Sequence, residues 1–94
     1  MSTIGLDGLT PEELPLPGET LAEELEEWGM SEEDLADRVN CHVNYIHDVI
    51  VGKRPISEWF ANSLGQVFGA SPGFWIGLQR AYDEDLAWLR EHQK

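Results

Sequence analysis

The sequence predicts an all-α fold of five helices, and three observations lead to this prediction. Apolar residues recur at helical spacing along most of the chain. The breaks between these periodic segments hold residues that stop and start helices, as in "GMS", "GKRPIS" and "GASP". No segment alternates apolar and polar residues as a half-buried strand does. A chain of 94 residues, 41% of them hydrophobic, is long enough to build one small core.

The chain is expected to divide into an N-terminal arm, residues 1–18, and a helical domain, residues 19–94. The arm is rich in Gly and Pro, so we expect it to be mobile or to lie on a partner. Within it, "TPEEL" favours one helical turn, with Thr10 as N-cap, Pro11 at the first position and Glu13 reaching back.

The first long helix is expected in "PGETLAEELEEWG", residues 17–29. Leu21, Leu25 and Trp28 recur at helical spacing and form one apolar stripe, while glutamates occupy the other face. Gly29 is expected to end this helix in the left-handed conformation, which Gly adopts most readily.

The second and third helices are expected around residues 32–39 and 43–51. Ser31 is the predicted N-cap of the second helix, and Asp34, three residues later, makes a variant of the capping box. Asn40 is the expected left-handed residue of the turn, because Asn follows Gly in its tolerance of positive φ. Gly52 is expected to stop the third helix.

The fourth and fifth helices complete the domain. Ser57 is the predicted N-cap of the fourth, which ends at Gly69, and the fifth runs from Pro72 to about residue 90. Trp59, in the first turn of the fourth helix, is either a loosely packed edge residue or an anchor for a partner.

The negative charge is concentrated in the front part of the chain. Twelve of the eighteen Asp and Glu residues lie in residues 1–37, which hold no Lys or Arg, and the net charge is −12. Such a field repels phosphate and attracts a basic protein, although a solvated helix face explains the acidic residues equally well.

No apolar run could span a membrane, no signal peptide is evident and Cys41 is the single cysteine, so we expect a cytoplasmic protein.

The sequence indicates no enzyme, no metal site and no cofactor. The acidic runs lie on expected helix faces without an implied cleft, and no Gly-rich phosphate loop is present. His42 and His47 are five residues apart, about 140° around a helix, so they do not share a face. Cys41 is interpreted as a small residue buried at the turn.

The second and third helices match the pattern of a helix-turn-helix, with a small residue at Ala36 and an aliphatic residue at Ile46 beyond a short turn. The segments "LPGETLAEEL", "GMSEEDLADRV", "IVGKRPIS" and above all "SPGFWIGLQRAYD" closely resemble the HigA-type antitoxins, Cro/repressor-like helix-turn-helix proteins of the XRE family. This resemblance covers about residues 15–90. It implies a five-helix lambda-repressor-like domain, usually dimeric, that neutralises a small, basic, mRNA-cleaving toxin of the HigB type. It also implies repression of its own operon through binding to double-stranded operator DNA.

Carried over residue by residue, the resemblance implies a DNA-binding surface made by the start of the second helix, the exposed face of the third and the loop after it. Its residues would be Ser31, Glu32, His42, Asn44, Tyr45, His47, Lys53 and Arg54. The chain departs from the family at two of them, since the family tends to have Gln in place of Glu32 and an Arg near Tyr45. A carboxylate at position 32 would face a phosphate, which costs affinity.

Three interpretations of the third helix remain open, because residues 40–52 contain no Lys or Arg. In the first, Asn44 pairs with adenine, the two histidines and Tyr45 donate to bases or phosphates, and nearby basic residues meet the backbone. In the second, DNA binding is lost and the domain survives as a toxin-binding scaffold; a diverged acidic protein-binding module without DNA binding is the related alternative function. In the third, His42 caps the helix, Asn44 and His47 are surface residues, and Tyr45 covers the edge of the core. A stand-alone repressor without a toxin is a further alternative.

Overall fold

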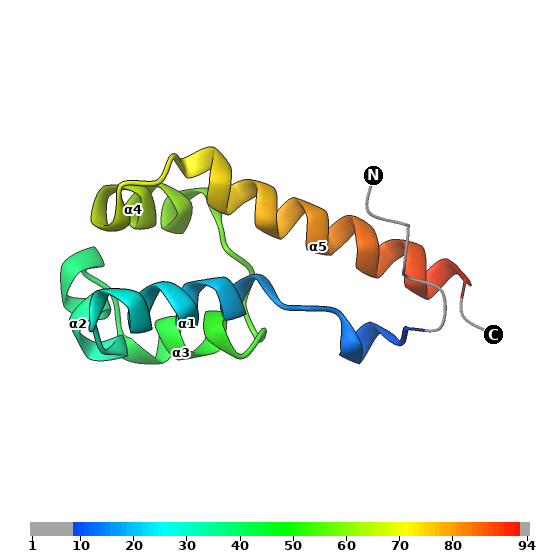
Figure 1. Cartoon of the computed structure of the whole chain (residues 1–94), viewed down its shortest axis with the longest axis horizontal. Helices are drawn as coiled ribbons and strands as arrows, with labels where there is room; N and C mark the ends of the chain where they lie inside the picture. Colours follow the sequence, from blue (N-terminus) through cyan, green and yellow to red (C-terminus); the bar gives the residue numbers. More distant parts are fainter. Residues whose placement is uncertain (1–8, 93–94) are drawn as a thin grey trace.

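The computed structural model describes residues 9–92, over which the chain forms one short 3-10 turn and five α-helices (Figure 1). In chain order these are η1 (Pro11–Glu13), α1 (Pro17–Trp28), α2 (Glu32–Val39), α3 (Val43–Ile50), α4 (Glu58–Phe68) and α5 (Pro72–His92). The predicted all-α class and its five helices are confirmed. None of the helices in this part of the chain combines the length and the apolar character needed to cross a membrane.

Local signals in the sequence set most of the helix boundaries. Gly29, Asn40 and Gly69 adopt φ angles of 62°, 60° and 82° and end α1, α2 and α4. Gly and Asn accept this left-handed conformation at the lowest cost. The hydroxyls of Ser31 and Ser57 each accept a hydrogen bond from the backbone amide three residues later, at 3.0 and 3.2 Å, and cap α2 and α4. The starts and stops predicted from these five residues are confirmed.

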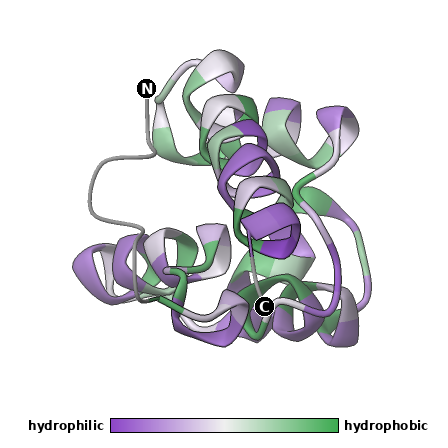
Figure 2. Cartoon of the chain, turned by 90° about the vertical axis from the view of Figure 1, so that its right-hand side faces the viewer, coloured by the Kyte–Doolittle hydropathy of each residue, from purple (hydrophilic) through white to green (hydrophobic). Residues whose placement is uncertain are grey.

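One apolar core joins the five helices and fixes α2 and α3 relative to each other. Figure 2 shows hydrophilic residues on the outer sides of the helices that surround it. Its buried members are Leu21, Leu25, Leu35, Ala36, Val39, Ile46, Val49, Ile56, Phe60, Ala61, Leu64, Phe68 and Trp75. Full burial of a side chain of Leu, Ile or Phe contributes about 1.5–3 kcal/mol, so the orientation of α3 is set mainly by its inner face.

The described part of the arm lies on its own chain. Leu14 is buried and forms a second apolar cluster with Leu89 of α5, against which Leu9, Tyr82, Leu86 and Trp88 pack. This corrects the expectation of a mobile or partner-bound arm for residues 9–16, because the C-terminal half of α5 extends past the core and presents an apolar stripe there. Residues 1–8 of the arm lie outside the described residues, and the domain boundary at residue 18 stays a prediction.

Trp28 departs from the stripe predicted for α1. Leu21 and Leu25 are buried, but 53% of the Trp28 surface is exposed. Its ring meets the ring of Phe68 edge-on, with centroids 5.5 Å apart. Trp28 is the last residue of α1, and the turn at Gly29 leads the chain away, so the indole lies at the edge of the core.

Candidate nucleic-acid interface

A tight turn holds α2 and α3 together. The left-handed Asn40 reverses the chain, and the Cys41 amide donates a hydrogen bond to the Ala36 carbonyl at 3.0 Å. Cys41 is half-buried and packs against the core, and burial raises the pKa of its thiol above the ordinary value. The thiol is therefore a weak nucleophile, which agrees with its interpretation as a turn residue.

His42 caps the N-terminus of α3. Its Nδ1 atom accepts a hydrogen bond from the backbone amide of Asn44 at 3.1 Å, while its carbonyl accepts one from the Tyr45 amide at 3.0 Å. The capping role considered for His42 is therefore confirmed. The imidazole nevertheless stays exposed, so capping does not remove it from the surface of α3.

Glu32 and His47 form a contact between α2 and α3. The Glu32 Oε1 atom lies 3.4 Å from Nδ1 of His47. The imidazole is more than half exposed, so solvent screens this contact and it contributes little to stability. Its consequence is positional: the carboxylate at the start of α2 is directed toward the outer face of α3.

Tyr45 and Arg54 form the centre of an aromatic cluster beside α3. The Arg54 guanidinium carbon lies 5.1 Å from the centroid of the Tyr45 ring, within the range of a cation–π interaction. Edge-on contacts join the same ring to Phe60 and Trp59, at 5.2 and 5.7 Å between centroids. The Tyr45 hydroxyl lies 3.4 Å from the Ser57 hydroxyl. Tyr45 is thus half-buried at the core edge and does not project freely from α3.

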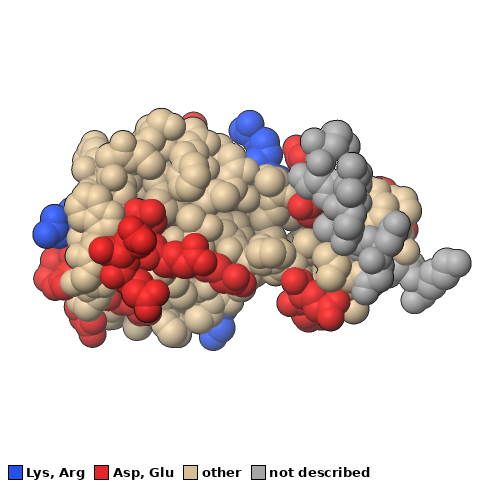
Figure 3. All heavy atoms as spheres, viewed as in Figure 1, with Lys and Arg blue, Asp and Glu red and all other residues tan. Residues whose placement is uncertain are grey.

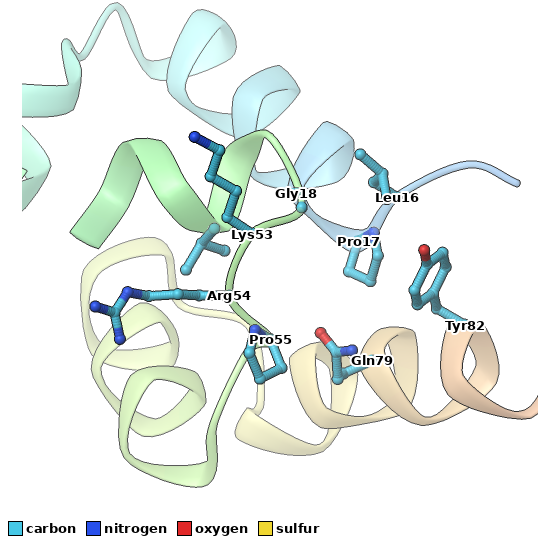
Figure 4. Close-up of a pocket in the computed structure, with 10 residues that line it drawn as sticks. Leu16, Pro17, Gly18, Lys53, Arg54, Pro55, Gln79 and Tyr82 are labelled. Carbon is cyan, nitrogen blue, oxygen red and sulfur yellow. The ribbon is translucent and has the colours of Figure 1, made fainter. Parts of the chain in front are cut away.

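Asp48 organises the loop that follows α3. Its carbonyl accepts hydrogen bonds from the amides of Lys53 and Arg54, at 2.8 and 3.2 Å, and its carboxylate lies 3.4 Å from Nε of Arg54. Figure 4 shows the Lys53 and Arg54 side chains leaving this loop in different directions. Part of the charge of Arg54 is therefore compensated within the chain, whereas Lys53 is exposed and forms no ion pair within residues 9–92.

A small pocket lies behind the same loop, between the start of α1 and α5 (Figure 4). Its volume is about 150 Å³, and its lining includes Pro17, Gln79 and Tyr82. Gln79 already uses its amide, accepting from the Ile56 backbone at 2.8 Å and donating to Asp83 at 2.9 Å. The Gln79 amide is thus engaged within the fold, and the two cations that also line this pocket, Lys53 and Arg54, already belong to the predicted α2–α3 site.

Comparisons with known proteins agree with this geometry. No protein-family model matches the chain. An uncharacterised helix-turn-helix transcriptional regulator of Haemophilus influenzae is 35% identical over 78 residues, 82% of this chain and 70% of the relative. The antitoxin HigA of Pseudomonas aeruginosa, solved with the higBA promoter, superposes with a TM-score of 0.77 at 32% identity, over 81% of this chain and 84% of that one. An addiction-module antidote protein of the HigA family from Coxiella burnetii gives a TM-score of 0.76 at 32% identity, over 92% of this chain and 98% of that one. The chain belongs to the HigA-type antitoxin family.

In this HigA-type chain the structure places the eight predicted site residues in four groups. Ser31 serves the cap of α2, Glu32 meets His47, and Tyr45 meets Arg54. His42, Asn44 and Lys53 are exposed along α3 and the loop after it.

Sequence reasoning missed one residue that shapes this surface, Asp48, which holds the loop through its carbonyl and its carboxylate. Trp59, which the sequence singled out, is 49% exposed and borders the ring of Tyr45. Asp48 lies six residues before Arg54, and no local pattern in the sequence indicates a contact across that loop.

Proposed function

We propose that this chain is the antitoxin of a type II toxin–antitoxin module, which represses its own operon through α3 and neutralises a small, basic, mRNA-cleaving toxin of the HigB type. Its membership of the HigA-type family is the observation that carries the proposal. The geometry supports the DNA-binding part, because the turn at Asn40 leaves His42 and Asn44 exposed on α3.

The DNA-binding surface would use neutral groups to read bases and few cations to hold the backbone. The Asn44 amide is suited to bidentate pairing with adenine. Lys53 and Arg54 would meet phosphates, and each such contact would contribute to the salt dependence of binding. With so few cations, we expect weak nonspecific binding and a shallow dependence of affinity on salt.

The protein-binding surface would be the outer side of α1. Figure 3 shows carboxylates gathered across the face of the molecule over this helix. α1 itself carries Glu19, Glu23, Glu24, Glu26 and Glu27, and none of them forms an ion pair within residues 9–92. Such a surface attracts a basic protein. A homodimer through α5, with or without α4, would place two copies of α3 on one DNA duplex.

The competing function is an acidic protein-binding module without DNA binding. It is favoured by the carboxylate at Glu32 and by the internal contacts of Arg54 with Asp48 and Tyr45. One experiment separates the two: capture of the tagged chain from its native host, with identification of bound protein and bound DNA. A basic protein together with DNA from upstream of the gene supports the antitoxin. Protein without DNA supports the module, and DNA without a basic protein supports a stand-alone repressor.

A further inference from the structure

The cap of α3 uses a different chemical group from the caps of α2 and α4. Ser, Thr, Asp and Asn are the common N-cap residues, because a side-chain oxygen accepts a hydrogen bond from a free backbone amide. In His42 the acceptor is the imidazole Nδ1 atom, 3.1 Å from the Asn44 amide nitrogen. The backbone of His42 is extended, with φ −75° and ψ 144°, as an N-cap position requires.

This capping bond determines where the imidazole proton lies. A backbone N–H can only donate, so Nδ1 must supply its lone pair and carries no hydrogen. Neutral imidazole has a single N–H group, which is therefore on Nε2. The two ring nitrogens point in diverging directions, so the Nε2–H group points away from the capped amide. While the cap is formed, the outward atom of His42 is a hydrogen-bond donor and never an acceptor.

A donor at the start of a reading helix distinguishes between bases. The N-terminal residues of such a helix contact base edges in the major groove. Guanine, adenine and thymine present acceptors there, whereas cytosine presents its N4 amine, which is a donor. We propose that His42 is a specificity-determining residue whose capping bond fixes it as a donor, so that it selects a base with an acceptor and rejects cytosine at one position of the bound site. This inference rests on the proposed DNA-binding function and adds the class of base that is read.

The tautomer is measured first, without DNA, on the full chain labelled with ¹⁵N at histidine. Long-range ¹H–¹⁵N correlation spectra distinguish a protonated ring nitrogen from an unprotonated one, and the spectrum of the H42N variant assigns the signal. We expect Nε2 of His42 to carry the proton. Equal populations of the two tautomers, or a proton on Nδ1, would overturn the inference whatever the DNA result.

The base preference is measured by selecting duplexes from a random pool, first with the wild-type chain. We expect cytosine to be disfavoured at one position by about 2- to 10-fold, the effect of one hydrogen bond. H42N and H42D form a matched pair, since Asn and Asp both cap helices well. The Asn amide can cap through its oxygen and donate outward, so H42N should keep the preference. The Asp carboxylate can only accept, so H42D should lose it or favour cytosine.

Failure of this inference is distinguishable from failure of the proposed function. If H42D and the wild-type chain select the same base at every position, the role of His42 is rejected while DNA binding stands. If the wild-type chain enriches no duplex at all, the DNA-binding function is rejected, and the role of His42 with it. Circular dichroism of both variants checks that the fold is retained. If H42D does not fold, the H42N variant alone tests whether an outward hydrogen-bond donor at position 42 sets the base preference, and loss of the preference in H42N would reject it.

Discussion

The Glu32 carboxylate and the His47 imidazole, 3.4 Å apart, join the first residue of α2 to the outer face of α3. Both residues belong to the surface proposed to meet DNA. A carboxylate held there repels phosphate, and an imidazole in contact with a carboxylate is less available to a base. If this surface meets DNA as proposed, we expect the arrangement to limit DNA affinity at Glu32.

The Glu32→Gln variant should bind DNA more tightly. Removal of one exposed charge contact is worth about 0.2–1 kcal/mol, which corresponds to about 1.4- to 5-fold in affinity. Fluorescence anisotropy with a labelled duplex from upstream of the gene measures the change. Glu23→Gln, the same charge change on an exposed residue of α1, should leave the affinity unaltered. If the two variants behave alike, α2 does not lie against the phosphate backbone as proposed.

The Lys53→Ala variant should bind DNA less tightly and with a shallower salt dependence. Each lost phosphate contact reduces the slope of log affinity against log salt by about 0.9. Arg54→Ala should have a smaller effect on the slope, because Asp48 already compensates part of the guanidinium charge. Arg80→Ala, on α5, serves as the control for loss of one positive charge. A slope for Lys53→Ala that equals the wild-type slope in a gel-shift titration would rule out a phosphate contact at this residue.

The Ser31→Ala variant should destabilise the fold through the cap of α2. The Ser31 hydroxyl accepts from the Asp34 amide at 3.0 Å, and the Asp34 carboxylate accepts from the Ser31 amide at 3.1 Å. Loss of such a cap costs about 1 kcal/mol, which lowers the Tm of a domain of this size by about 4–8 °C. Ser71→Ala is the matched control, since no hydrogen bond to the Ser71 hydroxyl is present within residues 9–92. Equal shifts for the two variants would mean that the Ser31 hydroxyl does not stabilise α2.

The sequence was sufficient to predict the features that depend on neighbours along the chain. Ser31, Asn40 and Ser57 each act within three to five residues of themselves, so their roles follow from local chemistry. Contacts between elements could not be predicted in this way. The pairing of Glu32 with His47 depends on how α2 and α3 cross, which the whole core sets, and the pairing of Tyr45 with Arg54 depends on the path of the loop after α3.

The same limit explains the two errors in the predicted fold. A helical stripe shows which residues share a face, but it does not show where the neighbouring element ends, so Trp28 was expected inside and lies half outside. The arm was expected to be mobile or partner-bound, because nothing near Leu14 in the sequence indicates that Leu89 lies beside it. For the candidate site, the residues of α3 were predicted, but their roles in capping and packing were left open.

The Gly18→Ala variant should destabilise the fold strongly, an effect that no local pattern around Gly18 indicates. A Cβ atom at Gly18 would overlap the backbone carbonyls of Val49 and Ile50, where α1 passes close to the end of α3. Rigid backbone cannot move aside, so we expect a cost of at least about 1–3 kcal/mol. Gly77→Ala is the control, because a Cβ there meets no atom within 4 Å and Ala favours the helix by about 0.8–1 kcal/mol. Urea unfolding at one fixed protein concentration measures the free energy of unfolding of both variants. A Gly18→Ala chain as stable as the wild type would contradict the close approach of α1 to the end of α3.

The two exposed tryptophans should differ in their effect on a protein partner. Trp28, the last residue of the acidic helix α1, is 53% exposed, and Trp59, in α4, is 49% exposed beside Tyr45 of α3. An exposed Trp at the centre of an interface is commonly worth about 2 kcal/mol or more of binding free energy. If the basic partner docks on α1, Trp28→Ala should weaken its binding about 30-fold or more, as that energy implies, while Trp59→Ala leaves it unchanged. Calorimetry with the basic protein recovered from the native host makes the measurement, and circular dichroism checks the fold. A larger loss for Trp59→Ala would move the docking surface from α1 to the α3–α4 side, where DNA and the protein partner would then compete for the same residues.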